Sequence, residues 1–305
     1  PKKGSHRNPF YCLIRCVLRS WLMGKQRGKN QIAQFRRVAE RLASRIRALH
    51  GVAGIIFMGG LVRGFADKYS DLDIVVFLNR KNDRLSRQIR IMGSKESRLS
   101  GLDVDLEVHS LTEFKNWKLE GMVMWDFSKA EIVYDLKGEV AKVFRRKFSV
   151  SESYWVHQIA VYAEYLKWYC CPSRKDVGTI SESWIDRGDI VSGHYCLNYA
   201  VDLMLQMVYA LNREFAPAPK WRVFYADSLK WTPSDFVRLI RECMVVKSLS
   251  VDDFRRRLGG IREIWREIVH KIEKETHLSL DLLSRHYVET VLSQVNIPEE
   301  SGLFN

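Results

Sequence analysis

The sequence lacks the patterns that mark several classes of protein. None of its six cysteines forms a C-x-x-C pair, and no second pair stands at zinc-ligand spacing, which argues against a zinc site. It has no internal repeat, no low-complexity tract and no secretory signal. The apolar stretch at residues 9–23 is interrupted by Arg15 and Arg19 and is too short to span a bilayer. We therefore expect a protein without a membrane span, located in the cytoplasm, whose cysteines are free thiols.

Positive charge, in contrast, is in excess. The chain has 49 Lys and Arg against 36 Asp and Glu, a formal net charge of +13. Such a balance favours polyanionic partners, such as a nucleoside triphosphate or a nucleic acid, although solubility alone would also account for it. Basic residues gather in an amphipathic N-terminal segment, residues 1–30, and in a tract at 137–147. The N-terminal segment is expected to pack on its own domain, with an RNA or a membrane surface as the alternative.

The periodicity of apolar residues predicts an α+β protein with two domains. Residues 31–50 have helical spacing, and strands are predicted at 54–58, 74–78, 102–109 and 131–135. Helices follow at 152–170, 189–213, 235–247, 251–275 and 279–296. We expect a small mixed β-sheet domain with flanking helices over residues 31–148, and an all-helical C-terminal domain over residues 149–305.

Two acids stand at the start of the second predicted strand, in the stretch MGGLVRGFADKYSDLD at residues 58–73. Asp71 and Asp73 are two residues apart, so that their side chains leave the same side of the sheet. Two carboxylates this close raise the pKa of one of them unless a cation lies between. Mg²⁺ suits such a pair, because it binds one or two carboxylates together with substrate phosphates.

A third carboxylate is expected from the strand LDVDLEVH at residues 102–109. Its strict alternation places Asp103, Asp105 and Glu107 on one face, with His109, and apolar residues on the other. Asp105, in the middle of the strand, is our first choice for a site shared with Asp71 and Asp73. Glu107 is the alternative, and Asp103 comes after it.

The same stretch has features that suit a phosphate. Gly59 and Gly60 have no Cβ, so that the backbone can approach an anion closely and offer its N–H groups. Arg63 is three residues further on and can bind the same anion bidentately. Ser70 can donate its hydroxyl. The P-loop pattern, with its lysine after the second glycine, is missing.

The Gly59-Gly60 pair, the spacer and the Asp71-x-Asp73 pair between two strands resemble the nucleotidyltransferase superfamily named after DNA polymerase beta. The likeness covers residues 31–135 and is nearest to the antibiotic (aminoglycoside-type) nucleotidyltransferases and related uncharacterised nucleotidyltransferase-domain proteins. It implies that Asp71, Asp73 and Asp105 hold two Mg²⁺ ions, or Mn²⁺, and are catalytic. A nucleotidyl group, AMP if the donor is ATP, would pass to an acceptor hydroxyl and pyrophosphate would leave.

The helical half carries weaker signals. Pro217 and Pro219 are predicted to form a rigid loop before Lys220, and a similar string in helical domains of that superfamily suggests that Lys220 binds the nucleotide. Asp189 is expected to cap a helix, with a place in an acceptor site as the alternative. Arg187 and His194 also match, superficially, the arginine–histidine spacing of a ribonuclease fold.

The hypotheses for an enzymatic function differ in the molecule that accepts the nucleotidyl group. An acidic cleft suits a polycationic small molecule such as an aminoglycoside-like sugar, whereas the net positive charge suits RNA, such as the 3′ end of a tRNA. The alternative to an enzyme is a non-catalytic nucleotide- or RNA-binding module on the same scaffold. The sequence leaves the oligomeric state and any regulatory partner open.

Overall fold

The computed structural model describes residues 28–172, 178–285 and 287. They form two compact units, one ending at Val150 and the other beginning at Ser151, and each is described by itself. Nearly all of the basic segment predicted at 1–30, and the second half of the helix predicted at 279–296, lie outside the described residues. Within the described ranges, no helix has the length and apolar character needed to cross a membrane.

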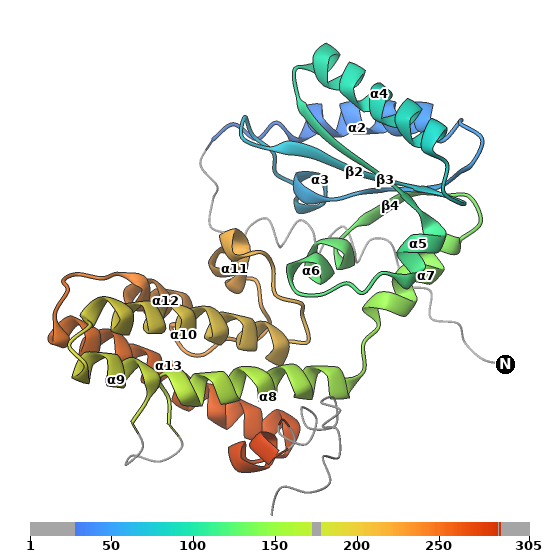
Figure 1. Cartoon of the computed structure of the whole chain (residues 1–305). Coiled ribbons are helices and arrows are strands. Elements are labelled where there is room, and N and C mark those ends of the chain that lie inside the picture. The colour runs from blue at the N-terminus through green and yellow to red at the C-terminus, as the bar shows by residue number, and fades with distance from the viewer. Residues whose placement is uncertain (1–27, 173–177, 286, 288–305) are drawn as a thin grey trace, which may run out of the picture. The chain divides into compact units, whose positions relative to one another are not determined.

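The first unit is built on a four-stranded mixed sheet in the order β3-β2-β1-β4 (Figure 1). β1 pairs antiparallel with β2 and β4, whereas β2 and β3 run parallel. The strands span Val52–Phe57 (β1), Asp71–Leu78 (β2), Asp103–Ser110 (β3) and Glu131–Asp135 (β4), and the helices span Ile32–Ile46 (α2), Gly59–Arg63 (α3), Asp83–Ser100 (α4), Leu111–Asn116 (α5), Met122–Ser128 (α6) and Glu139–Phe148 (α7). The predicted mixed sheet with flanking helices is confirmed.

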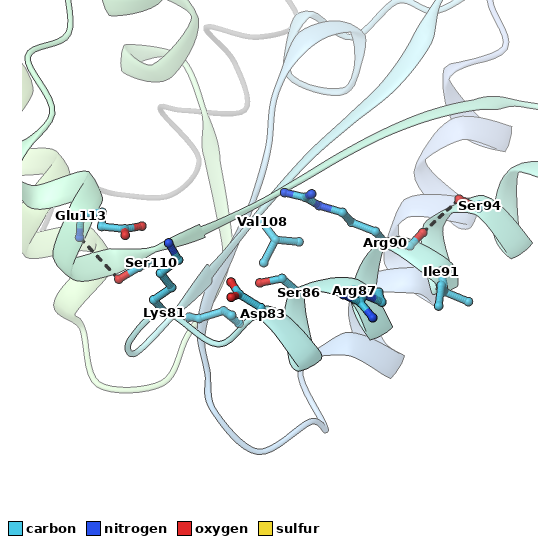
Figure 2. Close-up of a pocket in the computed structure, with 11 residues that line it drawn as sticks. Lys81, Asp83, Ser86, Arg87, Arg90, Ile91, Ser94, Val108, Ser110 and Glu113 are labelled. Carbon is cyan, nitrogen blue, oxygen red and sulfur yellow. Dashed lines mark hydrogen bonds between the residues drawn. The ribbon is translucent and has the colours of Figure 1, made fainter.

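The strand order places β3 at an edge of the sheet, with α4 packed beside it. α4 begins at Asn82, whose side-chain oxygen accepts a hydrogen bond from the backbone N–H of Leu85 at 3.0 Å and so caps the helix. A hollow of about 440 Å³ lies between α4 and the C-terminal end of β3 (Figure 2). Its lining is mainly basic and polar, and includes Lys81, Asp83, Ser86, Arg87, Arg90, Ser94, Ser110 and Glu113.

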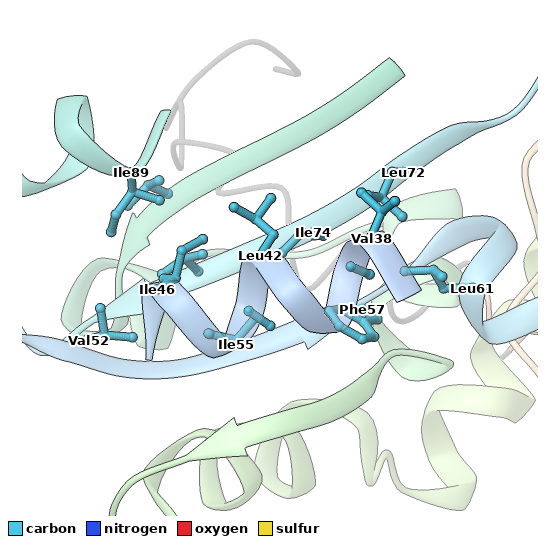
Figure 3. Close-up of a cluster of buried hydrophobic side chains, with 14 of the residues drawn as sticks. Val38, Leu42, Ile46, Val52, Ile55, Phe57, Leu61, Leu72, Ile74 and Ile89 are labelled. Carbon is cyan, nitrogen blue, oxygen red and sulfur yellow. The ribbon is translucent and has the colours of Figure 1, made fainter. Parts of the chain in front are cut away.

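One face of the sheet is covered by α2 and α4 and forms the larger core of this unit (Figure 3). The helical spacing of α2 places its apolar side chains on one stripe, which packs against β1 and β2. Alternate residues of β2 point into this core, namely Leu72, Ile74, Val76 and Leu78. The remaining residues of β2, beginning with Asp71 and Asp73, therefore face the other side, where α5, α6 and α7 pack.

An ion cluster joins the two helices of the covering layer. Glu96 of α4 is 1% exposed and pairs with Arg41 and with Arg45 of α2, the latter at 3.2 Å. The buried carboxylate is therefore neutralised from the side of α2, and not by the cations on the outer surface of α4.

The second unit is all-helical in the described residues, as predicted. Its helices span Glu152–Tyr169 (α8), Ile180–Asp186 (α9), Ile190–Leu211 (α10), Pro219–Ala226 (α11), Phe236–Met244 (α12) and Val251–Thr276 (α13). α10 is its most buried helix, and α8, α9 and α13 pack around it. Four cysteines lie in this unit as buried free thiols, as expected: Cys170, Cys171, Cys196 and Cys243.

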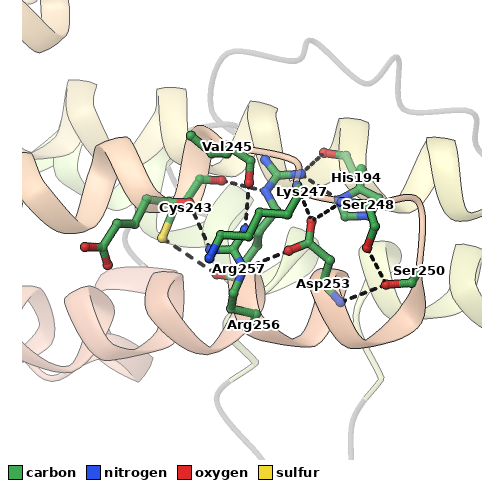
Figure 4. Close-up of polar contacts among 10 residues, drawn as sticks. His194, Cys243, Val245, Lys247, Ser248, Ser250, Asp253, Arg256 and Arg257 are labelled. Carbon is green, nitrogen blue, oxygen red and sulfur yellow. Dashed lines mark hydrogen bonds and ion pairs between the residues drawn. The ribbon is translucent and has the colours of Figure 1, made fainter.

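A buried arginine ties three helices of this unit together (Figure 4). Arg257 of α13 is fully buried and donates to the carbonyl of Cys243 at 2.6 Å, to Nδ1 of His194 at 2.7 Å and to the side-chain oxygen of Asn198. His194 is 4% exposed, and burial lowers its pKa. Its ring is thus committed to a neutral structural role, which argues against the ribonuclease-like pairing with Arg187. Asp189 caps α10, as predicted, by accepting from the backbone of Ser192 at 3.0 Å.

We expect Arg257→Met to destabilise the helical unit by about 3 kcal/mol, because two buried acceptors, the carbonyl of Cys243 and Nδ1 of His194, lose their donor. Arg255→Met is the matched control, since the Arg255 side chain lies on the same helix and is 74% exposed. Thermal unfolding followed by circular dichroism measures the difference. Equal melting temperatures for the two variants would contradict this role of Arg257.

Candidate active site

The antiparallel pairing of β1 and β2 brings the glycine pair to the acids. Phe57, the last residue of β1, is in register with Ile74 of β2. The next backbone N–H, that of Met58, donates to the carbonyl of Asp73 at 3.1 Å. α3 begins directly afterwards at Gly59, so that the turn from strand to helix lies on the Asp73 side chain.

Gly59 is required at this turn for two reasons. Its φ is +56°, in the left-handed region that favours glycine. A Cβ at this position would also lie 1.6 Å from Oδ2 of Asp73, a distance that no side chain permits. Gly60 is constrained as well, since its Cβ would lie 2.9 Å from the carbonyl oxygen of Phe65. Gly59 therefore lets the backbone close onto the carboxylate of Asp73, and Gly60 lets the same turn pack against the backbone of Phe65.

The parallel pairing of β2 and β3 brings the predicted acids together. Asp71 is in register with Asp103, and Asp73 with Asp105. Registered residues of parallel strands point to the same side, so the four carboxylates share one face. Further along this face, aromatic residues of α5 and α7 cover Val75 and Phe77. The acids therefore lie at the end of the sheet where the apolar cover stops.

Asp73 is the most perturbed of these acids. Burial, and then the charge of Asp71, raise its pKa to about 6, with Asp105 adding to the shift and Arg63 opposing it. The pKa of Asp105 is also raised, by burial and then by Glu107 and Asp71. The four side chains that influence Asp73 come from four elements, namely Asp71 from β2, Arg63 from α3, Asp105 from β3 and Asp126 from α6. They lie close enough to act as one electrostatic cluster.

Glu107, the alternative third carboxylate, has a different environment. Its Oε2 lies 2.6 Å from Nε2 of His109, and this hydrogen bond lowers its pKa. It is in register with Val75, one step beyond the Asp73–Asp105 pair. The structure thus brings Asp105 to the Asp71 and Asp73 pair and gives Glu107 a partner of its own.

The carboxylates suit a cation that arrives with a ligand. Among the described residues, no three His, Cys, Asp or Glu side chains converge as a ready-made metal site. Burial first, and then the negative charges of Asp71, Asp105 and Asp126, raise the pKa of Asp73, and Arg63 offsets this shift only in part. Mg²⁺ needs one or two carboxylates when phosphates and water complete its shell, so Asp71 and Asp73 fit an ion bound together with a triphosphate.

The other predicted residues fall into three groups. Arg63, at the end of α3, acts on the charge of Asp73 and so lies beside the acids. The Ser70 hydroxyl accepts from the backbone N–H of Asp67 at 3.0 Å and closes the preceding turn, so its role toward a nucleotide remains a prediction. Lys220 belongs to the second unit, exposed at the start of α11, and its role also remains a prediction.

Sequence reasoning missed Asp126, the fifth residue of the α6 helix. Its charge raises the pKa of Asp73 and places it near the acids. It stands between the buried side chains of Trp125 and Phe127, on a short helix without a clear period. In the sequence, the one feature that points to Asp126 is the position of a single acid between two aromatic residues.

We expect Asp73→Asn to stabilise the metal-free protein above pH 6 by up to about 2 kcal/mol. A folded pKa of about 6 exceeds the unfolded value, so that ionisation of Asp73 costs stability as the pH rises from about 4 to 6. Asparagine has no such ionisation. Melting temperatures in EDTA at pH 4.5 and 7.5 test this: the gain over wild type must appear at the higher pH and shrink at the lower one.

Comparison with known proteins identifies one family and two distant structural neighbours. Residues 39–134 match the family model of the nucleotidyltransferase domain. No curated protein matches the chain. A nucleotidyltransferase-like protein from Exiguobacterium sibiricum 255-15 is similar in structure at 12% identity, with 85% of this chain and 80% of that chain covered and a TM-score of 0.41. Spectinomycin adenyltransferase AAD(9) from Enterococcus faecialis, solved with ATP and spectinomycin, is similar at 12% identity over 84% of this chain and 99% of that chain, with a TM-score of 0.30.

Structural similarities this distant carry no weight for the assignment, which follows from the family match. The matched segment contains the glycine turn, both strands of acids and α6. The chain therefore carries a nucleotidyltransferase domain, in agreement with its resemblance to the polymerase beta-like superfamily, and is a transferase.

Proposed function

We propose that this domain transfers a nucleoside monophosphate, AMP in the first instance, from a nucleoside triphosphate to an acceptor hydroxyl with release of pyrophosphate. The observation that carries the proposal is the register of β2 with β3, which sets Asp105 opposite Asp73 beside the turn at Gly59. Acids from β2 and β3 thus lie beside a turn whose glycines leave the backbone accessible. This is the arrangement that a triphosphate with its cation requires.

In this proposal each residue has a defined task. Asp71 and Asp73 hold two divalent cations with the triphosphate, and Asp105 joins them as the third ligand. Bound cations supply charge neutralisation of the phosphates and a lower pKa for the acceptor hydroxyl. Gly59 and Gly60 let the backbone approach the phosphates, and Arg63, which lies near Asp73, adds positive charge to the same place.

The reaction is an in-line displacement. The acceptor oxygen forms a bond to the α-phosphorus while the bond from that phosphorus to the pyrophosphate oxygen breaks. In this proposal Asp105 helps to activate the acceptor hydroxyl and takes the proton that it loses. Lys220 and Ser70 are assigned to nucleotide binding on the sequence resemblance alone. The acceptor is a small molecule or an RNA.

The test is incubation of the protein with each α-³²P-labelled nucleoside triphosphate and Mg²⁺, with total cell RNA and a metabolite extract as parallel acceptors. Wild type is compared with Asp71→Ala/Asp73→Ala. Glu273→Ala/Glu275→Ala is the matched control, because it removes two exposed acids at the same spacing from α13. We expect label to reach one acceptor fraction with wild type and with the control, and not with the Asp71/Asp73 variant.

Two outcomes would count against the proposal. Transfer that persists in the Asp71/Asp73 variant would place the chemistry elsewhere. Heat stabilisation by triphosphate and Mg²⁺ without any release of pyrophosphate would instead favour a non-catalytic nucleotide-binding module.

A further inference from the structure

The exposed surface of α4 is rich in positive charge. Its five basic residues are all exposed: Arg84, Arg87, Arg90, Lys95 and Arg98. The helix has two acids, Asp83 at its first turn and Glu96, which is buried and paired with arginines of α2. The charge of the outward cations is therefore largely uncompensated along the helix.

Part of this charged surface borders the hollow between α4 and β3. Figure 2 shows Lys81 beside Ser110 at one end and Arg90 reaching toward β3 at the other, with Arg87 between them on the helix. Asp83 and Glu113 also line the hollow, so its own charge is modest and the excess lies on the adjoining helix surface. We call this hollow, together with the exposed cations of α4, the α4–β3 groove.

The groove is separate from the candidate active site but close to it. Val108 points into the core under α4, whereas Asp105 points to the opposite face of β3. Ser110 is five residues beyond Asp105 along the strand, a distance of roughly 16 Å. Because β3 is an edge strand, a flexible ligand can pass around it from one face to the other.

The length of the charged surface indicates a polymer. From Arg84 to Arg98 the helix rises by roughly 21 Å, which is longer than a triphosphate. Regularly spaced cations on one surface are typical of contacts to a phosphate backbone. Ser86 and Ser94 donate to helix carbonyls at 2.9 and 3.1 Å and keep lone pairs for a ribose 2′-hydroxyl.

We propose that the α4–β3 groove binds the phosphate backbone of an RNA and leads its acceptor hydroxyl around β3 to Asp105. The choice of RNA as the acceptor rests on the proposed function, whereas the binding of RNA in the groove does not.

The test is fluorescence anisotropy with a labelled single-stranded RNA of about 20 nucleotides, titrated in EDTA at several salt concentrations. We expect Arg87→Glu/Arg90→Glu to weaken binding by at least about 10-fold at low salt and to reduce the slope of log affinity against log salt by about 1.4, since two phosphate contacts are lost. Arg145→Glu/Arg146→Glu is the matched control. It makes the same change in net charge on exposed residues of α7, within the other basic tract of the domain.

Equal losses in the two variants would overturn the proposal, because they would reduce the effect to net charge. Unchanged binding in Arg87→Glu/Arg90→Glu would overturn it as well, as would equal affinity for a DNA of the same sequence. Arg87→Gln/Arg90→Gln, with melting curves for all variants, guards against a folding defect and should show a smaller loss of the same kind.

Asp73→Asn separates the groove from the proposed reaction. This variant should bind RNA as wild type does while failing to transfer label. If RNA binding depends on Arg87 and Arg90 but label never reaches any acceptor, the proposal that the groove binds RNA is supported and the proposed reaction is contradicted. If label reaches only a small molecule and the groove variant binds RNA normally, the reaction stands and the groove proposal fails.

Discussion

Gly59→Ala is expected to reduce nucleotidyl transfer at least about 100-fold, because the new Cβ would occupy the position of the Asp73 carboxylate. The clash, at 1.6 Å from Oδ2, must be relieved by moving Asp73 or the turn. Movement of Asp73 takes its carboxylate away from Asp105, and movement of the turn takes the backbone away from the acids. Steady-state kinetics with the acceptor fraction identified above measures the effect as a loss in kcat.

Gly101→Ala is the control for Gly59→Ala. Gly101 ends α4 with a φ of +70°, and within the described chain no atom lies within 4 Å of its would-be Cβ. Both variants therefore carry the strain of a left-handed alanine, about 1–2 kcal/mol, but one alone disturbs the acids. Similar melting temperatures with very different kcat values would support the assignment. A parallel loss of activity in both would trace the defect to backbone strain.

Asp105→Asn is expected to lower kcat by at least about 1,000-fold, whereas Glu107→Gln should stay within a few-fold of wild type. Both substitutions remove one charge from the same face of β3 and keep the shape of the side chain. They differ in what the carboxylate meets: Asp105 is in register with Asp73, and Glu107 is bonded to His109. The pair of variants thus decides which acid of the strand is the third ligand.

The Mg²⁺ dependence of each variant adds a second readout to kcat. Loss of a cation ligand should raise the Mg²⁺ concentration needed for half-maximal rate in Asp105→Asn and leave it unchanged in Glu107→Gln. The reverse pattern would make Glu107 the third carboxylate and would move the reacting centre one step along β3.

Local pattern was sufficient for much of the site. The spacing of Asp71 and Asp73 predicted a shared face, and the alternation of residues 103–107 predicted the acidic strand. What the sequence left open was the pairing, because register depends on contacts between segments distant in the chain. The parallel alignment of β2 with β3 distinguishes Asp105 from Glu107 in a way that neither strand reveals alone.

Residues whose environment depends on contacts with other helices or strands could not be predicted from the sequence, because those contacts join segments that are distant in the chain. Glu96 looks like a solvent-facing acid in the sequence, yet it is buried because arginines of α2 approach it. Asp126 lies on a helix too short to show a period, so nothing local connected it with Asp73. The role of Lys220, in the second unit, stays a prediction that the kinetics of Lys220→Ala would address.

The exposed position of β3 has a consequence for handling the protein. An edge strand offers unpaired N–H and C=O groups to other chains, and charged side chains are a common protection against such association. Asp103, Asp105 and Glu107 place three negative charges along this edge. The acids needed for chemistry would then also keep the molecules apart, so that variants neutralised in β3 should be more prone to aggregate and are best assayed at low concentration.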